Sequence, residues 1–172
     1  GVYALGRNPQ KLKQALKEFL DSDTANLLQM TAPELSGKLA EKLLKIAKRD
    51  NHKVFFTNSG TEAIEGALKF AKAATGRSQL LSLKHGFHGL TTGALAINGG
   101  SNFKHPFLPL LDANTIDPDL KLLEKMLQTG RYAAFAFEPI QGKGVYPLSK
   151  EFMEGAIRMC RQYGTVSICD EI

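Results

Sequence analysis

Residues 54–72, VFFTNSGTEAIEGALKFAK, constrain the fold more than any other segment, because a polar turn joins a short apolar strand pattern directly to an amphipathic helix. The apolar residues of the helical part recur at the spacing of one buried helix face: Ile64, Ala67, Leu68 and Ala71. A strand that leads straight into a buried helix is a building unit of α/β proteins. We therefore predict a strand at 54–57 and a helix that stops at Thr75-Gly76, since glycine favours a C-terminal cap.

Similar patterns fill the rest of the chain. Helical periodicity covers residues 10–20, 34–49, 117–128 and 149–162, and apolar runs typical of buried strands cover 79–83, 132–137 and 165–169. The apolar residues of the first helix share one face, and we expect those of the second helix to point inward. A polar connection over 21–31 is expected between the two helices. The alternation of strands and helices predicts parallel βαβ units, so the expected fold class is α/β with a mostly parallel sheet.

Size, charge and composition exclude several classes of function. The 172 residues, of which 43% are hydrophobic, suit one ordinary domain. Neither a bilayer-spanning apolar run nor a signal-peptide pattern is present, so we expect no membrane partner. The net charge of +5 is spread along helix faces without interleaved aromatic residues, which argues against nucleic acid as a partner. Cys160 and Cys169 lack zinc-ligand spacing, so we expect no metal and two reduced core cysteines in a cytoplasmic protein.

The turn before the helix at residue 60 carries a possible anion site. Ser59 is a candidate N-cap, and Glu62 three residues later completes a capping-box pattern. A helix start presents free backbone N–H groups to a phosphate, Gly60 allows close approach, and Thr61 adds a hydroxyl donor. From these residues alone, an ordinary capped helix and a phosphate-binding helix start remain equally good interpretations.

Polar residues follow three of the predicted strands. Asn58 and Ser59 follow the first, Glu138 follows AAFAF, and Asp170 follows TVSIC. In parallel sheets, ligands bind where the carboxyl ends of the strands meet, so these side chains predict a common site. The polar group at any one of these strand ends could instead cap the next helix, but that alternative is weaker for all three strand ends together.

Five motifs occur in a fixed order: GVYALGRNP, FFTNSGTEA, HGFHG, FEPIQG and ICDEI. In this order they resemble the class III pyridoxal-phosphate (PLP) aminotransferases, the group that contains ornithine, acetylornithine, putrescine and 4-aminobutyrate aminotransferases. The resemblance implies a three-layer α/β fold, the incomplete large domain of the fold-type I PLP-dependent transferases. Residues 1–50 would be an N-terminal helical segment, and residues 51–172 the N-terminal part of the PLP-binding domain.

The resemblance also implies roles for the residues at the helix start and in HGFHG. Ser59, Gly60 and Thr61 would hold the phosphate of PLP, and Phe87 would stack on its pyridine ring. His88 follows Phe87 as in the family and is included in the cofactor site. Taken alone, a histidine at this position is more often a hydrogen-bonded loop residue, so both interpretations of His88 stay open.

The remaining implied roles fall on two carboxylates. Asp170 would hydrogen-bond the ring nitrogen and keep it protonated, so that the ring can accept electrons from the substrate. Glu138 would lie near the substrate. The family resemblance further implies a homodimer, with a phosphate contact donated by the partner chain.

The chain departs from the family pattern at three points. The family's Schiff-base lysine follows the Asp170 motif, so we expect it beyond Ile172 and expect the 172 residues alone to be inactive. Lys143 replaces the second glutamate of EPIQGEGG, and it would repel the arginine that this glutamate pairs with in several members. Leu90 stands where the acetylornithine branch has an arginine, which disfavours an acylornithine substrate.

These observations support two hypotheses of different classes. In the first, the chain is a fragment of an aminotransferase that moves an amino group from a diamine or ω-amino acid, similar to putrescine or ornithine, to a 2-oxo acid. The stretch FKHPFLPLL favours the putrescine and diamine branch. In the second, the chain is a truncated, inactive PLP-fold relic or binding protein. A nucleotide-binding protein is disfavoured, because neither GxGxxG nor GxxxxGK[ST] is present.

Overall fold

The computed structural model describes residues 4–24 and 33–172, and the chain divides into two compact units at Phe55/Phe56. Most of the polar connection predicted over 21–31 lies outside the described residues. The first unit contains helices α1 (Gln10–Leu20) and α2 (Glu34–Ala47). Both helices are where the periodicity predicts them, and α2 ends two residues early because Lys48 adopts a left-handed backbone with φ 52°.

The apolar faces of α1 and α2 are not buried, which for α2 corrects the expectation that this face points inward. Neither helix contains a buried residue, and Leu12 and Leu16 of α1 are 63% and 55% exposed. Periodicity decides that a segment is helical, whereas burial also requires a surface to cover the apolar stripe. Within the first unit, no described residue buries these stripes.

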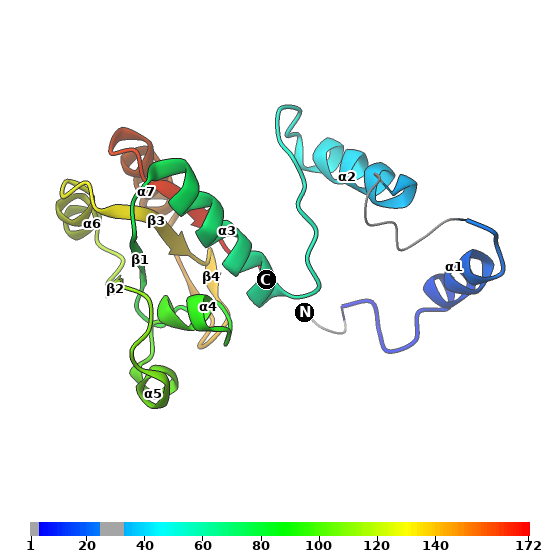
Figure 1. Ribbon diagram of the computed structural model, residues 1–172, viewed down its shortest axis with the longest axis horizontal. Coiled ribbons are helices and arrows are strands. Elements are labelled where there is room, and N and C mark those ends of the chain that lie inside the picture. Colours follow the sequence, from blue (N-terminus) through cyan, green and yellow to red (C-terminus); the bar gives the residue numbers. More distant parts are fainter. Residues whose placement is uncertain (1–3, 25–32) are drawn as a thin grey trace. The chain divides into compact units, whose positions relative to one another are not determined.

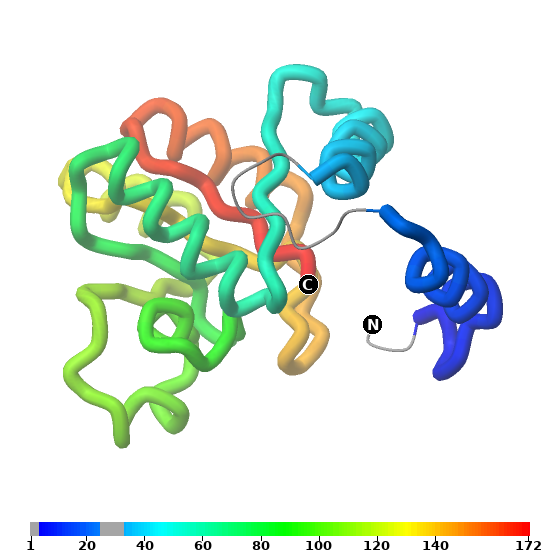
Figure 2. The backbone as a smooth tube through the Cα atoms, turned by 45° about the vertical axis from the view of Figure 1, so that its right-hand side comes forward, coloured from blue at the N-terminus to red at the C-terminus, as the bar shows by residue number. Residues whose placement is uncertain are grey.

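The second unit, 56–172, contains the sheet and the helices around it (Figure 1). Its helices are α3 (Gly60–Thr75), α4 (Thr92–Ala96), α5 (Ser101–Lys104), the 3-10 helix η1 (His105–Phe107), α6 (Leu120–Leu127) and α7 (Lys150–Gln162). Its strands are β1 (Gln79–Leu83), β2 (Ala113–Ile116), β3 (Tyr132–Phe137), β4 (Ile140–Gln141), β5 (Tyr146–Pro147) and β6 (Val166–Cys169). The chain segments of this unit can be followed as a tube in Figure 2.

The main sheet has the strand order β2-β1-β3-β6, and all its pairings are parallel. A short antiparallel pair, β4 and β5, forms a separate hairpin. All six residues of β3 are buried, as expected for a central strand covered on both faces. Parallel neighbours require crossover connections, and helices supply them here.

Two hydrophobic cores cover the two faces of this sheet. One core packs Phe135 and Phe137 of β3 against Leu123 of α6 and Phe152 of α7. The other packs the opposite face against α3 and α4, including Ile64 and Leu68 with Ala71 of the predicted helix face. Figure 1 shows α3 and α7 on opposite sides of the strands. The fold is therefore the predicted three-layer α/β sandwich with a mostly parallel sheet.

Two local predictions are wrong, and one strand was not predicted. Residues 54–57 form no strand, because a strand needs a hydrogen-bonded neighbour and no strand of the described ranges pairs with this segment. Strand β2 lies in a stretch that the sequence patterns left unassigned. Cys169 is exposed, whereas Cys160 is buried as expected. Burial raises the pKa of the Cys160 thiol to about 12, so it stays a neutral core residue.

None of the helices in the described ranges is both long and apolar enough to span a bilayer. The longest of them, α3, has 16 residues and a polar N-terminal turn.

Candidate functional site

A cavity of about 290 Å³ lies in the second unit, and it gathers most of the residues predicted for the site. Six of the seven line it: Gly60, Thr61, Phe87, His88, Glu138 and Asp170. Gly89, Gly142, Lys143 and Ile172 complete the lining. We call this space the first cavity. Glu138 and Asp170 follow strands β3 and β6, and Gly60 begins α3, so the cavity lies at the carboxyl edge of the sheet.

The seventh predicted residue, Ser59, caps α3 and does not line the first cavity. Its Oγ accepts a hydrogen bond from the Glu62 N–H at 3.4 Å. The Glu62 carboxylate in turn accepts from the Asn58 N–H at 2.7 Å, one residue before the position that a regular capping box uses. The capping interpretation of Ser59 is therefore confirmed in a slightly shifted form.

The start of α3 has the donors that an anion needs. In the described part of the chain, no acceptor takes the backbone N–H groups of Gly60 and Thr61. A Cβ at position 60 would collide with the Cδ1 atom of Ile172, so a side chain here would also fill the cavity. Figure 2 shows the C-terminal end of the chain beside the start of α3. These free donors and the positive end of the helix dipole favour a phosphate or carboxylate.

A hydrogen-bond chain ties Thr61 to α4. The Thr91 hydroxyl donates to Oε1 of Glu65 at 2.6 Å, because an ionised carboxylate can only accept. The Thr91 oxygen is then free to accept from the Thr61 hydroxyl, 2.7 Å away. The Thr91 N–H donates back to the Thr61 oxygen at 3.3 Å. This chain fixes the orientation of Thr61 at the cavity wall.

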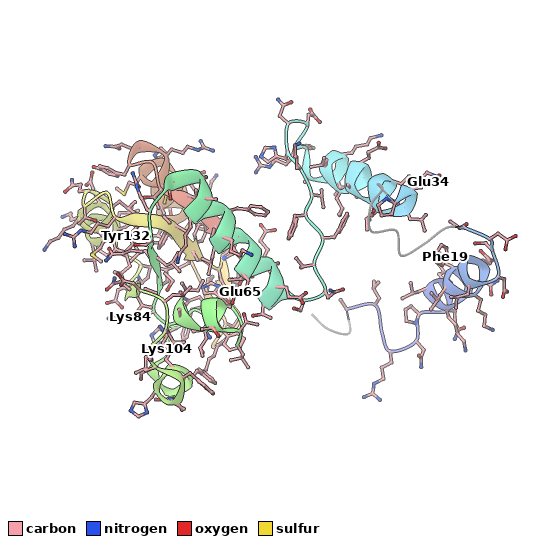
Figure 3. The ribbon with its side chains drawn as sticks, viewed as in Figure 1. Phe19, Glu34, Glu65, Lys84, Lys104 and Tyr132 are labelled. Carbon is pink, nitrogen blue, oxygen red and sulfur yellow. The ribbon has the colours of Figure 1, made fainter. Side chains whose placement is uncertain are left out.

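Glu65 anchors that chain to the start of α4, beside which it lies in Figure 3. The same Oε1 atom accepts the N–H groups of Gly93 and Ala94 at 2.7 and 3.1 Å. Partial burial is the largest single effect on the pKa of Glu65, and it raises that pKa. The hydrogen bonds from Thr91, Ala94 and Gly93 and the charge of Lys69 lower the pKa, and together they outweigh burial, so the net shift is downward. Glu65 is therefore a carboxylate held in its charged form.

His88 and Asp170 form a buried pair. The Nδ1 atom of His88 lies 2.9 Å from Oδ2 of Asp170, with side-chain exposures of 0% and 4%. The Ile172 N–H donates to the other Asp170 oxygen at 3.1 Å. The His88 backbone N–H donates to Oδ1 of the fully buried Asn98, which fixes the loop. The other ring nitrogen of His88 is buried without a hydrogen-bond partner in the described ranges. The pair therefore has a fixed geometry and one unused polar atom.

Glu138 holds the loop that carries Phe87. One of its oxygens accepts from the Phe87 N–H at 3.0 Å, and the other accepts from the Gly142 N–H at 2.9 Å. Phe87 presents its partly exposed ring to the cavity and meets the Phe103 ring edge-on, with 5.9 Å between centroids. Since both oxygens of Glu138 are bound to backbone, its visible role is to position the aromatic wall.

Several residues that shape the site were not predicted from sequence. Asn98 also donates to the Gly89 carbonyl at 2.8 Å, and the buried Gln141 donates to the Lys84 carbonyl at 2.8 Å. Glu65 and Thr91 belong to the same set. Asn98 directly precedes Gly99-Gly100, where the side chain of any other residue at 99 would collide with the His85 backbone N–H. That glycine pair is the signal that could have drawn attention to the loop.

The cavity combines three kinds of group in one small space. Free N–H donors at a helix start suit an anionic group, the Phe87 ring suits a flat ring, and the Asp170 carboxylate suits a protonated nitrogen. An α/β fold with such a cavity at the carboxyl edge of its sheet defines a protein that binds a phosphorylated aromatic cofactor. The unassigned polar atom of His88 beside Asp170 is consistent with a cavity built around a ligand.

Comparisons with known proteins agree with this class. Residues 1–172 match the family model described as aminotransferase class-III, so the chain belongs to the class-III aminotransferases. It is 40% identical over 176 residues to aminotransferase PigE of a Serratia strain, covering 100% of this chain and 21% of that protein. It is 39% identical over 168 residues to the acetylornithine aminotransferase of Archaeoglobus fulgidus, covering 95% of this chain and 42% of that enzyme.

A solved structure shows the same fold. An amine transaminase from an uncultivated Pseudomonas species, crystallised in a PLP-bound form, superposes with a TM-score of 0.87 at 26% identity. The match covers 97% of this chain and 45% of that one. The chain thus spans less than half the length of these relatives, and its fold corresponds to an incomplete domain of the PLP-dependent aminotransferases.

Proposed function

We propose that the chain is the PLP-binding part of a class-III aminotransferase that moves an amino group from a diamine or ω-amino acid, similar to putrescine or ornithine, to a 2-oxo acid. One observation carries the proposal: the first cavity brings together the start of α3, the Phe87 ring and the Asp170 carboxylate from three distant segments. In this proposal, residues 51–172 are the N-terminal part of the cofactor-binding domain and residues 1–50 a helical segment that precedes it.

The α3 start would hold the phosphate of the cofactor. The N–H groups of Gly60 and Thr61 would donate to phosphate oxygens, and the helix dipole would favour the negative charge. In this hydrogen-bond chain the Thr61 hydroxyl proton is directed to Thr91, so Thr61 would contribute its backbone N–H and not its hydroxyl to the phosphate. Ser59 would act indirectly, since its Oγ is engaged in capping α3.

Phe87 and Asp170 would hold the ring of the cofactor. PLP supplies an electron-accepting ring that stabilises negative charge at the substrate carbon. Phe87 would cover one face of that ring, and Asp170 would keep the proton on its nitrogen through a charge-assisted hydrogen bond. His88 is a positioning residue in this scheme, because its Nδ1 contact at 2.9 Å fixes the Asp170 carboxylate. Glu138 would keep Phe87 in place and exclude water behind it.

A direct binding experiment tests this proposal. We expect the chain to bind PLP, and Asp170→Asn to weaken that binding about tenfold, as the loss of one charge-assisted hydrogen bond predicts. The matched control is Asp117→Asn, since Asp117 is also an aspartate that follows a strand but pairs with Lys84 on the surface. Titration of PLP followed by its absorbance measures all three proteins. The proposal fails if the wild-type chain does not bind PLP or if both variants bind it equally well.

The alternative is an inactive binding protein that keeps only the cofactor cavity. It is favoured by one observation: Lys143 is the one lysine among the residues that line the first cavity, and its ammonium lies over the Phe103 ring. The gene sequence after codon 172 separates the two proposals. A lysine at a strand end beyond Asp170 supports the enzyme, and a stop codon directly after Ile172 supports the binding protein.

We further propose a cytoplasmic homodimer in which the partner chain completes the phosphate site. Support for association comes from the apolar stripes of α1 and α2, which are not buried within the first unit. Support for a reducing compartment comes from Cys160 and Cys169, both of which are free thiols.

A further inference from the structure

A second cavity, of about 250 Å³, adjoins the first one. Phe87 and Lys143 line both cavities, so these two side chains form the wall between them. Phe103, Tyr146 and His85 line the second cavity but not the first, and the lining of the second cavity contains no carboxylate. The second cavity is therefore a space with aromatic walls and a positive electrostatic character.

The ammonium group of Lys143 is available to a ligand. Among the ion pairs of the described residues, none includes Lys143, and its recorded contact is the Phe103 ring, 4.2 Å from Nζ to the centroid. A cation–π contact orients an ammonium without neutralising it. Neither carboxylate of the first cavity forms an ion pair with it: Glu138 accepts from two backbone N–H groups, and Asp170 contacts His88 and the Ile172 N–H.

We propose that the second cavity is a carboxylate-binding subsite and that Lys143 is its specificity-determining residue, so that the amino donor is an ω-amino acid and not a diamine. The inference rests on the proposed PLP site in the first cavity. A substrate that reacts there would extend its carbon chain past Phe87 between the aromatic walls. A distal carboxylate would then meet Lys143, whereas the second ammonium of a diamine would meet a like charge.

Two stable probes test this subsite on the chain itself. Borohydride reduction of PLP mixed with 4-aminobutyrate or with 1,4-diaminobutane gives secondary amines that share the cofactor and a four-carbon chain. Their distal groups differ, a carboxylate in one and an ammonium in the other. The ratio of their dissociation constants reports the contribution of the distal group to binding. The dissociation constant of PLP alone reports binding to the first cavity.

We expect the wild-type chain to bind the carboxylate probe about tenfold more tightly than the ammonium probe. This ratio corresponds to the free energy of about one hydrogen bond between charged groups. Lys143→Gln should bring the ratio close to one, Lys143→Glu should invert it, and Lys143→Arg should preserve it. Because Lys143 also lines the first cavity, PLP alone is titrated with each variant, and the two probes are compared only within the same variant. Lys150→Gln is the matched control, because Lys150 is a lysine on the surface of α7 with a side chain 79% exposed.

The outcomes separate this inference from the proposal beneath it. If PLP alone does not bind to the wild-type chain, the proposed function fails and the subsite fails with it. If PLP binds but the ratio of the two probes is the same in wild type and Lys143→Gln, only the subsite is refuted. A wild-type preference for the ammonium probe would also refute it, and would favour a diamine as donor.

Discussion

Glu65 lies outside the cavity lining, and yet it determines how the Thr61 hydroxyl is presented at the wall. Its Oε1 atom accepts from the Thr91 hydroxyl and from two N–H groups of α4. Because that acceptor uses the Thr91 proton, the Thr61 proton points to Thr91. A single carboxylate thus orders two hydroxyl groups at a site where a phosphate is proposed to bind.

We predict that Glu65→Gln destabilises the chain by about 1 kcal/mol at neutral pH, a value below that of buried charged hydrogen bonds because Glu65 is partly solvent-exposed. The folded-state pKa of Glu65 lies below its ordinary value of 4.5. The stabilising contribution is therefore fully present above about pH 4.5 and is lost as the pH falls through the lower, folded-state pKa. Urea unfolding of wild type and variant at several pH values measures the difference.

The control for this prediction is Glu154→Gln on α7, whose carboxylate lies 3.8 Å from Lys150 on the surface. Its replacement should change the free energy of unfolding by less than about 0.5 kcal/mol at any pH. A Glu65→Gln difference that persists unchanged in acid would show that the carboxylate charge is not the cause.

At the scale of whole elements, α3 and α7 have equivalent N-terminal caps with different neighbours. Ser59 Oγ accepts from the Glu62 N–H, and Ser149 Oγ accepts from the Phe152 N–H at 3.1 Å. We predict that Ser59→Ala and Ser149→Ala each cost about 1 kcal/mol of stability, as cap removal usually does. Only Ser59→Ala should also weaken PLP binding, because the α3 start borders the first cavity. Equal PLP affinities in the two variants would contradict a phosphate site at α3.

The elements that sequence alone predicted are those with a complete local signal. Helix α3 has an apolar face, a capping serine and a glycine stop, and it begins and ends as predicted. Strand β3 is a continuous apolar run and matches its predicted bounds. Strand β2 has the sequence ANTI, which is too short and too polar to stand out, and only its pairing with β1 makes it a strand.

The residues of the candidate site were likewise predictable only where the sequence carries a local signal. Asp170 and Glu138 could be found because they directly follow buried strands, which fixes their edge of the sheet. Asn98 and Glu65 could not, because their partners are 10 and up to 29 residues away and depend on how the loops pack. The strand predicted at 54–57 failed for a related reason: its apolar residues satisfy a strand pattern, but a ladder partner is a property of the whole sheet.

At the scale of the whole molecule, apolar side chains of the first unit and one edge of the sheet in the second unit are exposed. Strand β6 is at one end of the order β2-β1-β3-β6, so one of its edges has no strand neighbour in the described ranges. The stripes of α1 and α2 add Leu12, Leu16 and Leu39, which are 63%, 55% and 48% exposed. Exposed edges and apolar patches of this kind promote association.

We therefore predict that the 172-residue chain self-associates or is poorly soluble. Replacing Leu12 and Leu16 with Gln should reduce the mean mass measured by sedimentation velocity, because it removes apolar atoms from the α1 stripe while the helix retains good helix formers. The matched control replaces Lys13 and Lys17 of the same helix with Arg, which keeps the charge and leaves the stripe intact. A monodisperse wild-type monomer with one cooperative melting transition would contradict the prediction. Association that is unchanged by the Leu substitutions would instead assign it to another surface, with the free edge of β6 as the next one to test.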